Sequence, residues 1–213
     1  MYRNYEIHDI SILPEVIAHY KLDGFNVTIP YKESVISLLD LLDPDAAAVG
    51  AVNCVKVRQG KLVGFNTDII GFEYVLSGLI DLQKEHKALI FGNGGASRAV
   101  KFVLDKHGIP YRVVTRKLSE HNLTYSTLDE THLQAHDLLI NTTPVGMFPG
   151  VEEVLELPYH AVSDKHIAYD LIYNPEKTRF LAECEKRGAR IMNGYNMLIR
   201  QAEESLRIFE QDE

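Results

Sequence analysis

Cysteine and long apolar runs are both scarce in this 213-residue sequence. Its two cysteines, Cys54 and Cys184, supply neither a disulfide framework nor the spacing of a zinc site. We expect no metal site. No apolar run approaches the roughly 20 residues that span a bilayer, and the first residues lack the apolar segment of a secretory signal. We therefore expect a soluble protein of the reducing cytoplasm with no membrane partner.

The sequence also lacks an excess of basic charge. Its 22 Lys and Arg against 30 Asp and Glu give a formal net charge of −8. A surface that neutralises nucleic-acid phosphates needs clustered Lys and Arg, so no nucleic-acid partner is expected. Hydrophobic residues make up 46% of the chain and charged residues 24%, which is typical of a globular protein rather than a disordered one.

Short apolar runs alternate with helical periodicity between residues 87 and 196. Helices are predicted over residues 96–107 and 176–187, each followed by a glycine that favours its end. Strands that are separated by helices indicate βαβ units and a parallel sheet. The predicted strands cover residues 87–91, 111–114, 137–141, 167–170 and 189–192.

The N-terminal third has a less regular pattern. Apolar side chains at helical spacing over residues 195–209 predict a C-terminal helix that lays one face on a core. We expect two lobes with a boundary near residues 67–72. In the first lobe, the predicted elements are a strand over 24–30, a helix over 32–42, and strands over 51–57 and 61–66 around a turn at Gln59–Gly60.

A glycine-rich turn follows the strand predicted at 87–91 and opens the helix predicted at 96–107. In the segment Gly92–Ser97, Gly92 permits a tight turn and Gly94 permits close backbone approach to a ligand. The free N–H groups of the following helix attract a pyrophosphate. This context predicts a dinucleotide site, although Ser97 replaces the third glycine of the usual pattern. The alternative is a glycine-rich turn that binds nothing.

The residues after the next predicted strand bear on which dinucleotide binds. An NAD site usually places Asp or Glu here to bind the ribose 2′-hydroxyl, but Thr115, Arg116 and Lys117 follow Val114 instead. An arginine can grip a 2′-phosphate through two parallel hydrogen bonds. NADP is therefore favoured over NAD, with a solvated basic loop as the alternative.

Polar side chains stand at strand ends and turns outside the glycine turn, where function concentrates on a rigid scaffold. Lys32 follows Pro30 closely and could carry a proton if its ammonium is partly desolvated or lies beside a carboxylate. Each signal also has a plain structural interpretation. Lys32 could be an exposed helix residue, Asp68 a helix N-cap, and Asn53 a partner for backbone groups.

Seven segments, taken together, resemble the shikimate 5-dehydrogenase family, in the same order and over most of the chain from about Asn26 to Ala202. The resemblance implies an NADP-dependent oxidoreductase that interconverts 3-dehydroshikimate and shikimate, in the biosynthesis of chorismate and aromatic amino acids. The segments are Asn26–Lys32, Gly50–Asn53, Asn66–Asp68, Gly92–Arg98, Asn141–Met147, Tyr169–Pro175 and Asn193–Ala202.

The resemblance also implies roles for individual residues. Lys32 would transfer the proton, with Asp68 as its partner. Substrate hydroxyl and carboxylate groups would be bound by Thr28, Asn53, Tyr173 and Gln201. NADP would be held by Gly92, Asn93, Gly94, Gly95 and Ala96 at the pyrophosphate, Thr115 and Arg116 at the 2′-phosphate, and Leu171 and Gly194 near the nicotinamide.

The expected fold is α/β with two lobes. Residues 68–194 would form an NADP-binding, Rossmann-like domain with a parallel sheet. Residues 1–67 and 195–213 would form a smaller α/β substrate lobe closed by the C-terminal helix. Tyr2–Ile7 is similar to the family's second strand, and the family's first strand, its substrate-binding serine loop and its first helix have no counterpart here. We therefore expect a substrate lobe that is truncated at its N-terminus, or a natural short homologue.

Three readings of function stay open from the sequence. The first is shikimate dehydrogenase, impaired by the shortened lobe. The second is a non-catalytic NADP-binding homologue that acts as a sensor or an interaction partner. The third is a quinate or shikimate dehydrogenase of the same superfamily. The intact Lys32 and Asp68 favour an enzyme, and a monomer or homodimer is expected.

Overall fold

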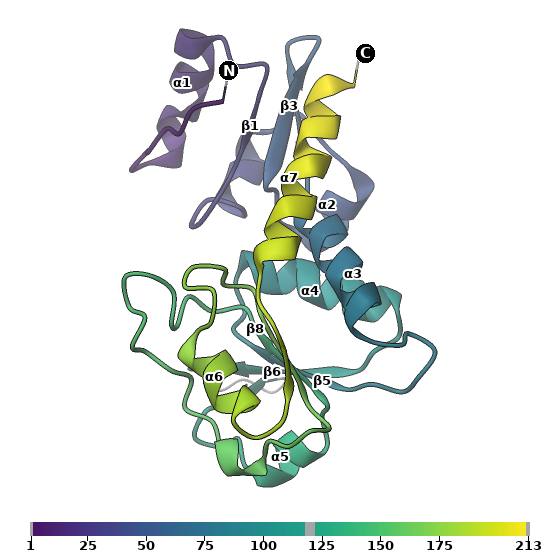
Figure 1. Cartoon of the computed structure of the whole chain (residues 1–213). Coiled ribbons are helices and arrows are strands. Elements are labelled where there is room, and N and C mark those ends of the chain that lie inside the picture. Colours follow the sequence, from purple (N-terminus) through teal and green to yellow (C-terminus); the bar gives the residue numbers. More distant parts are fainter. Residues whose placement is uncertain (1, 118–121, 212–213) are drawn as a thin grey trace. The chain divides into compact units, whose positions relative to one another are not determined.

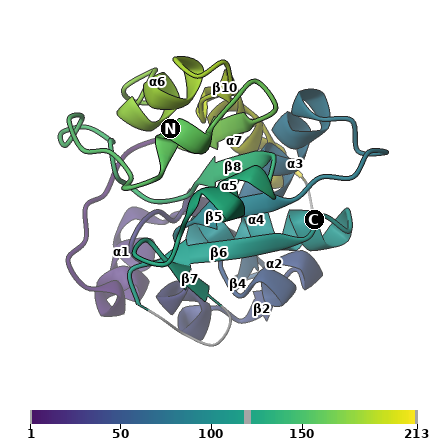
Figure 2. The same cartoon turned by 90° about the horizontal axis from the view of Figure 1, so that it is seen from below.

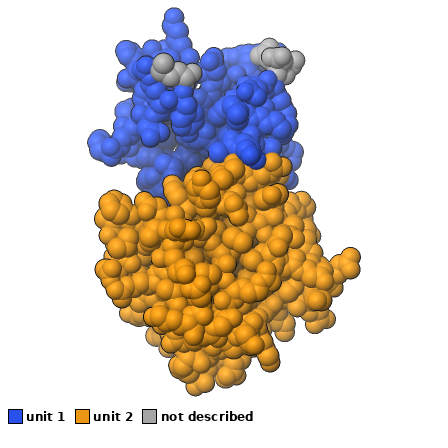
Figure 3. Space-filling model, in the orientation of Figure 1, with its two compact units in different colours: residues 1–67, 202–213 blue, residues 68–201 orange. Residues whose placement is uncertain are grey.

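The computed structural model describes residues 2–117 and 122–211, which divide into two compact units (Figures 1 and 3). Unit 1 comprises residues 1–67 and 202–213, and unit 2 comprises residues 68–201. The first division coincides with the start of helix α3, and the second falls inside helix α7. The assignment of substrate binding to one unit and cofactor binding to the other stays a prediction.

Unit 2 is built on a six-stranded parallel sheet in the order β10-β9-β8-β5-β6-β7 (Figure 2). This confirms the predicted α/β class and parallel pairing. The short edge strand β7 was not predicted. The strands are β5 (Ala88–Phe91), β6 (Tyr111–Thr115), β7 (Asn122–Thr124), β8 (Leu138–Asn141), β9 (Ile167–Asp170) and β10 (Arg190–Met192).

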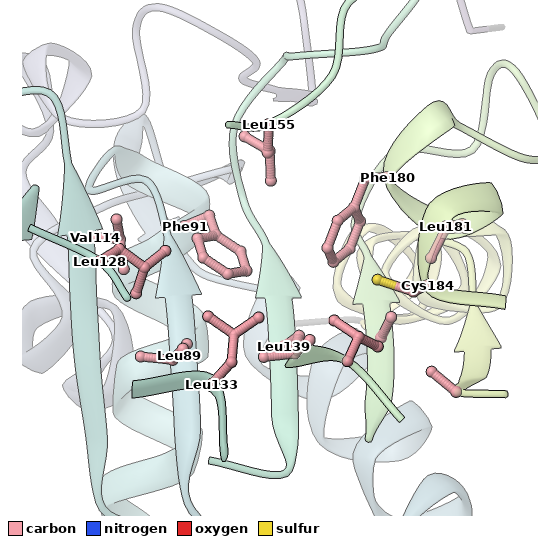
Figure 4. Close-up of a cluster of buried hydrophobic side chains, with 13 residues drawn as sticks. Leu89, Phe91, Val114, Leu128, Leu133, Leu139, Leu155, Phe180, Leu181 and Cys184 are labelled. Carbon is pink, nitrogen blue, oxygen red and sulfur yellow. The ribbon is translucent and has the colours of Figure 1, made fainter. Parts of the chain in front are cut away.

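Both faces of this sheet are covered, which explains why its central strands are apolar without alternation. On one face, the Phe91 ring of β5 meets the Phe180 ring edge-to-face at 5.9 Å, within a buried apolar cluster (Figure 4). Elsewhere in the unit, the Tyr169 ring of β9 stacks on Phe72 at 5.5 Å. The helices of the unit are α3 (Asp68–Leu79), α4 (Gly95–Lys106), α5 (Glu130–Gln134), α6 (Arg179–Glu185) and the start of α7 (Tyr195–Glu210), with a 3-10 helix η3 (Tyr159–Ala161).

Unit 1 contains a four-stranded sheet in the order β1-β3-β4-β2. The central hairpin turns at Gln59 and Gly60, whose φ angles are +50° and +75°, as a two-residue hairpin turn of this type requires. This hairpin was predicted. The elements are η1 (Ile10–Ile12), α1 (Leu13–Tyr20), β1 (Gly24–Asn26), η2 (Ser34–Leu38), β2 (Leu41–Leu42), α2 (Pro44–Val49), β3 (Cys54–Arg58) and β4 (Lys61–Phe65).

The predicted α-helix over residues 32–42 was wrong. The segment forms the short 3-10 helix η2 and then β2, which pairs parallel to β4. The backbone N–H of Asp40 donates to the Leu62 carbonyl at 3.0 Å, and the Asp40 carboxylate accepts from the Leu62 N–H at 2.7 Å. The Asp40 N–H is therefore not available to a helix, and the pairing with β4 makes the end of the segment a strand. Residues 2–9 contain no strand, although Tyr2–Ile7 was expected to form one.

The C-terminal half of α7 packs on unit 1. The Phe209 ring lies so close to Gly24 of β1 that an added Cβ there would stand 2.7 Å from a ring carbon. Ser205, which is buried, contacts the side chains of Asn26 and Thr67 at 2.9 and 3.1 Å. The C-terminal helix therefore closes the small sheet, as the sequence predicts.

Candidate active site

The glycine turn lies at the carboxyl end of β5, where open α/β sheets bind their ligands. Gly92 has a φ of +104°, and a Cβ there would stand 2.7 Å from the Thr142 hydroxyl oxygen. Both the conformation and the space therefore require glycine. The Thr142 hydroxyl in turn donates to the Phe91 carbonyl at 2.7 Å, which joins the ends of β5 and β8.

The start of α4 fits a phosphate group. Gly94 is its N-cap residue and supplies no side-chain cap to the helix, while a Cβ at Gly94 would meet nothing within 4 Å. The first N–H groups of a helix have no partner within the helix, so here they are available to an anion. The hydroxyl of Ser97 is buried without a hydrogen-bond partner among the described residues. Asn93 is held by Lys101, whose ammonium donates to its side-chain oxygen at 2.8 Å.

Thr115 and Arg116 lie at the same edge of the sheet as the glycine turn. Thr115 ends β6, and the Gly92 N–H donates to the carbonyl of Val114 at 2.9 Å. The Arg116 side chain is exposed, and the Thr115 hydroxyl donates to the carbonyl of Lys117 at 2.7 Å. An exposed guanidinium beside the dinucleotide turn suits an added phosphate.

Leu171 and Gly194 meet at the ends of β9 and β10. A Cβ on Gly194 would stand 2.0 Å from the Leu171 carbonyl oxygen, so only glycine fits. The Gly194 N–H donates to the carbonyl of Ile172 at 2.9 Å, and the Leu171 N–H to that of Asn141 at 3.0 Å. The two residues predicted near the nicotinamide are therefore neighbours in unit 2.

The other predicted residues of unit 2 are Asp68, Tyr173 and Gln201. Asp68 is the first residue of α3, where the helix dipole favours a negative charge. One turn on, a Cβ at Gly71 would stand 2.7 Å from the Met197 carbonyl and 3.2 Å from the Gln201 Cβ. Glycine thus lets α7 approach α3, and this close packing brings Gln201 beside the first turn of α3. Tyr173 follows β9 and is half exposed.

In unit 1, Thr28, Lys32 and Asn53 lie where β1 and β3 meet. The Val27 N–H donates to the Asn53 carbonyl at 2.8 Å, and the Val52 N–H donates to the Lys32 carbonyl at 2.7 Å. Thr28 is exposed and Lys32 is half buried. The structure thus gathers the three residues within one small region of the unit.

Asn53 also has a structural task. Its side-chain oxygen accepts from the Thr67 N–H at 2.7 Å, and its amide donates to the Thr67 hydroxyl at 3.0 Å. Asn53 therefore fixes the residue directly before Asp68. The alternative weighed from the sequence, that Asn53 satisfies backbone groups, holds for its side-chain oxygen.

Asn141, Thr142, Asp170 and Thr178 received no predicted role, although they build the carboxyl edge of the sheet. Asn141 and Asp170 are wholly buried at the ends of β8 and β9, and they hydrogen-bond at 3.1 Å. A polar residue that ends a buried apolar strand was the signal available in the sequence.

Two cavities, of about 630 and 730 Å³, lie elsewhere. One is lined by α3 and α7, including Tyr74 and Arg200, and the other lies by the amino ends of β5, β8 and β9. The strand carboxyl ends are the expected ligand edge, so we place the site there. Within residues 2–117 and 122–211, no cluster of side chains could hold a metal ion and no helix is long and apolar enough to cross a membrane.

Comparison with known proteins gives the context of this site. Residues 1–55 match the family model described as the shikimate dehydrogenase substrate binding domain. The shikimate dehydrogenase (NADP(+)) of Methanococcus maripaludis is 40% identical over 214 residues, which cover 92% of this chain and 77% of that protein.

Solved structures agree with this relationship. The shikimate dehydrogenase of Aquifex aeolicus matches with a TM-score of 0.85 at 33% identity, covering 97% of this chain and 79% of that one. Shikimate 5-dehydrogenase of Thermus thermophilus, in complex with NADP(H) and shikimate, matches with a TM-score of 0.82 at 32% identity, covering 95% and 79%. This chain belongs to the shikimate dehydrogenase family.

Proposed function

We propose that this chain catalyses the NADP-dependent, reversible reduction of 3-dehydroshikimate to shikimate, an oxidoreductase reaction of aromatic amino-acid biosynthesis. The observation that carries the proposal is the glycine turn at Gly92–Gly95, which opens a helix and stands beside Arg116, in a member of this family. Its relatives carry the name shikimate dehydrogenase (NADP(+)), and one related structure holds NADP(H) together with shikimate.

The cofactor would be held along the carboxyl edge of the parallel sheet. Gly92 to Ala96 would bind the pyrophosphate, because the N–H groups of the first turn of α4 lack partners within the helix. Thr115 and Arg116 would bind the 2′-phosphate, and Leu171 and Gly194 would border the nicotinamide. NADPH, when bound, supplies the hydride that the ketone carbon receives.

The protein's own side chains would handle the proton and the orientation of the substrate. The Lys32 ammonium would donate a proton to the ketone oxygen during reduction and take it back during oxidation, with Asp68 as its partner. Thr28, Asn53, Tyr173 and Gln201 would orient the substrate through its hydroxyl and carboxylate groups. Correct orientation lowers the barrier because reacting groups no longer need to find one another. The expected oligomeric state, a monomer or a homodimer, stays a prediction.

The proposal is tested by incubating the purified chain with shikimate and NADP and following NADPH absorbance. We expect turnover with this pair, and slower turnover when NAD replaces NADP. Quinate, offered in parallel, decides between the two substrates of the superfamily. NADPH binding without turnover on either substrate would contradict the proposal and favour a non-catalytic NADP-binding protein.

A further inference from the structure

Asp170 is a carboxylate with no exposed surface at the carboxyl end of β9. Its Oδ1 accepts from the Ile172 N–H at 3.0 Å and from the Asn141 amide at 3.1 Å, and its Oδ2 accepts from the Thr178 hydroxyl at 2.6 Å. Two donors, Ile172 and Thr178, come from the segment between β9 and α6, and the third, Asn141, ends the neighbouring strand β8. A buried carboxylate is costly unless such donors surround it, so both segments are tied to one group.

The bonds continue outward from Asp170 on both sides. On the side of β8, the Asn141 side-chain oxygen accepts from the backbone N–H and the hydroxyl of Thr143, at 2.9 and 2.7 Å. On the side of β10, Ile172 accepts from the Gly194 N–H at 2.9 Å. One carboxylate thus connects the loop after β8 to the close backbone contact between Leu171 and Gly194.

Leu171 and Gly194, which this network holds in place, are the residues that the proposed function places beside the nicotinamide of NADP. The adenosine half is assigned to other elements, the glycine turn and the end of β6. A loss of the carboxylate should therefore loosen one half of the cofactor site and leave the other half in place.

We propose that Asp170 is a positioning residue that fixes the contact between Leu171 and Gly194 beside the nicotinamide of NADP. The inference rests on the proposed function, and it adds a residue that touches neither substrate nor cofactor. Its action passes through Asn141, Ile172 and Thr178.

Asp137 offers a matched control, because it immediately precedes β8 at the opposite edge of the same sheet. Its carboxylate accepts from the Lys87 N–H at 2.8 Å and contacts the His86 ring at 2.5 Å. Asp137→Asn therefore also weakens a carboxylate that connects two segments, but at the amino ends of the strands, away from the proposed cofactor.

The test compares the full-length wild type with Asp170→Asn, Thr178→Val, Thr178→Ser and Asp137→Asn. The two probes are NADPH and adenosine 2′,5′-bisphosphate, which lacks the nicotinamide half. For Asp170→Asn and Thr178→Val, we expect the NADPH dissociation constant to rise about tenfold, as the loss of one charge-assisted bond allows. The constant for the bisphosphate should change by less than about twofold. Thr178→Ser keeps the hydroxyl and should bind NADPH like the wild type.

The fluorescence of bound NADPH provides a second readout, because it reports the surroundings of the nicotinamide alone. It should fall in Asp170→Asn and stay unchanged in Asp137→Asn. An equal loss for both probes, or the same NADPH loss in Asp137→Asn, would overturn the positioning role and leave the proposed function standing. A wild type that binds the bisphosphate but neither binds NADPH nor turns over substrate would instead refute the proposed function, and the positioning role with it.

Discussion

Gly194 and Leu171 cross so closely that a Cβ on residue 194 would lie 2.0 Å from the Leu171 carbonyl oxygen. The neighbouring bond from the Gly194 N–H to the Ile172 carbonyl, at 2.9 Å, locks this crossing. Backbone atoms cannot move aside as the end of a flexible side chain can. The identity of residue 194 therefore decides the shape of the loop that precedes Tyr173.

Gly194→Ala should displace this loop, because the obstructing atom belongs to the backbone. We expect a loss of stability of about 1–3 kcal/mol, as for other overpacked sites, and weaker NADPH binding. Urea unfolding and NADPH titration measure both effects. Gly78→Ala is the matched control, since a Cβ there meets nothing within 4 Å. In the helix α3, this control should gain about 0.5–1 kcal/mol. Equal stability of the two variants would contradict the close contact between residue 194 and the Leu171 carbonyl.

Arg116→Gln should reduce the preference for NADPH over NADH. A charge-assisted bidentate contact is worth on the order of 1.5–3 kcal/mol, so NADPH binding should weaken roughly 10- to 150-fold while NADH binding stays nearly constant. Titration of the two nucleotides checks this. Arg112→Gln removes an exposed arginine of β6, the strand that Arg116 follows, and should alter neither constant. If Arg116→Gln weakens both nucleotides equally, the 2′-phosphate is bound elsewhere.

Lys32→Ala should abolish most turnover and leave NADP affinity nearly unchanged, because no cofactor contact is assigned to Lys32. General acid–base residues typically contribute about 10²–10⁴-fold to the rate. Steady-state kinetics with shikimate and NADP, beside a direct NADPH titration, separate the two effects. Lys61→Ala, at an exposed position of β4, serves as the control. A Lys32→Ala enzyme with the wild-type rate would remove the proton-transfer role.

Stability should depend on pH through Asp170. Burial raises the pKa of this carboxyl from 3.8 to about 6, against the lowering by hydrogen bonds from Thr178, Ile172 and Asn141. Because the pKa is higher in the folded state, the folded chain holds a proton that the unfolded chain releases between these values. The contribution of Asp170 to stability is therefore fully present below about pH 4 and is lost as the pH rises through 6.

Asp170→Asn removes this titration. As the pH rises from 4 to 7, the wild type should lose up to about 3 kcal/mol of its free energy of unfolding relative to the variant. The titratable neighbours of Asp170, which are Tyr159, Tyr169 and Cys184, have raised pKa values and stay neutral over this range. Urea unfolding at several pH values measures the difference. A difference that does not change with pH would mean that Asp170 keeps one protonation state throughout.

Local sequence pattern was sufficient for the parallel sheet and insufficient for the smaller elements. The strand at residues 167–170 was predicted with both of its ends, because a short apolar run between turn signals has few other solutions. The prediction for residues 32–42 was wrong because their apolar spacing also suits a helix, whereas in the structure Asp40 of this segment hydrogen-bonds to Leu62 of β4. Strand β7 is only three residues long and lies at the edge of the sheet, so its sequence carries little periodicity.

For the candidate site, the sequence by itself determined the residues that backbone chemistry makes special. Gly92 is recognisable because only glycine suits its turn, and Arg116 because it replaces the expected acid. The tertiary structure alone decided which distant residues meet. Asp170 and Asn141 stand 29 positions apart, and their contact exists because β8 and β9 are adjacent in register. The sequence states which side chain stands at each position. The partners of a buried carboxylate, however, depend on the order of the strands, which is a property of the whole sheet.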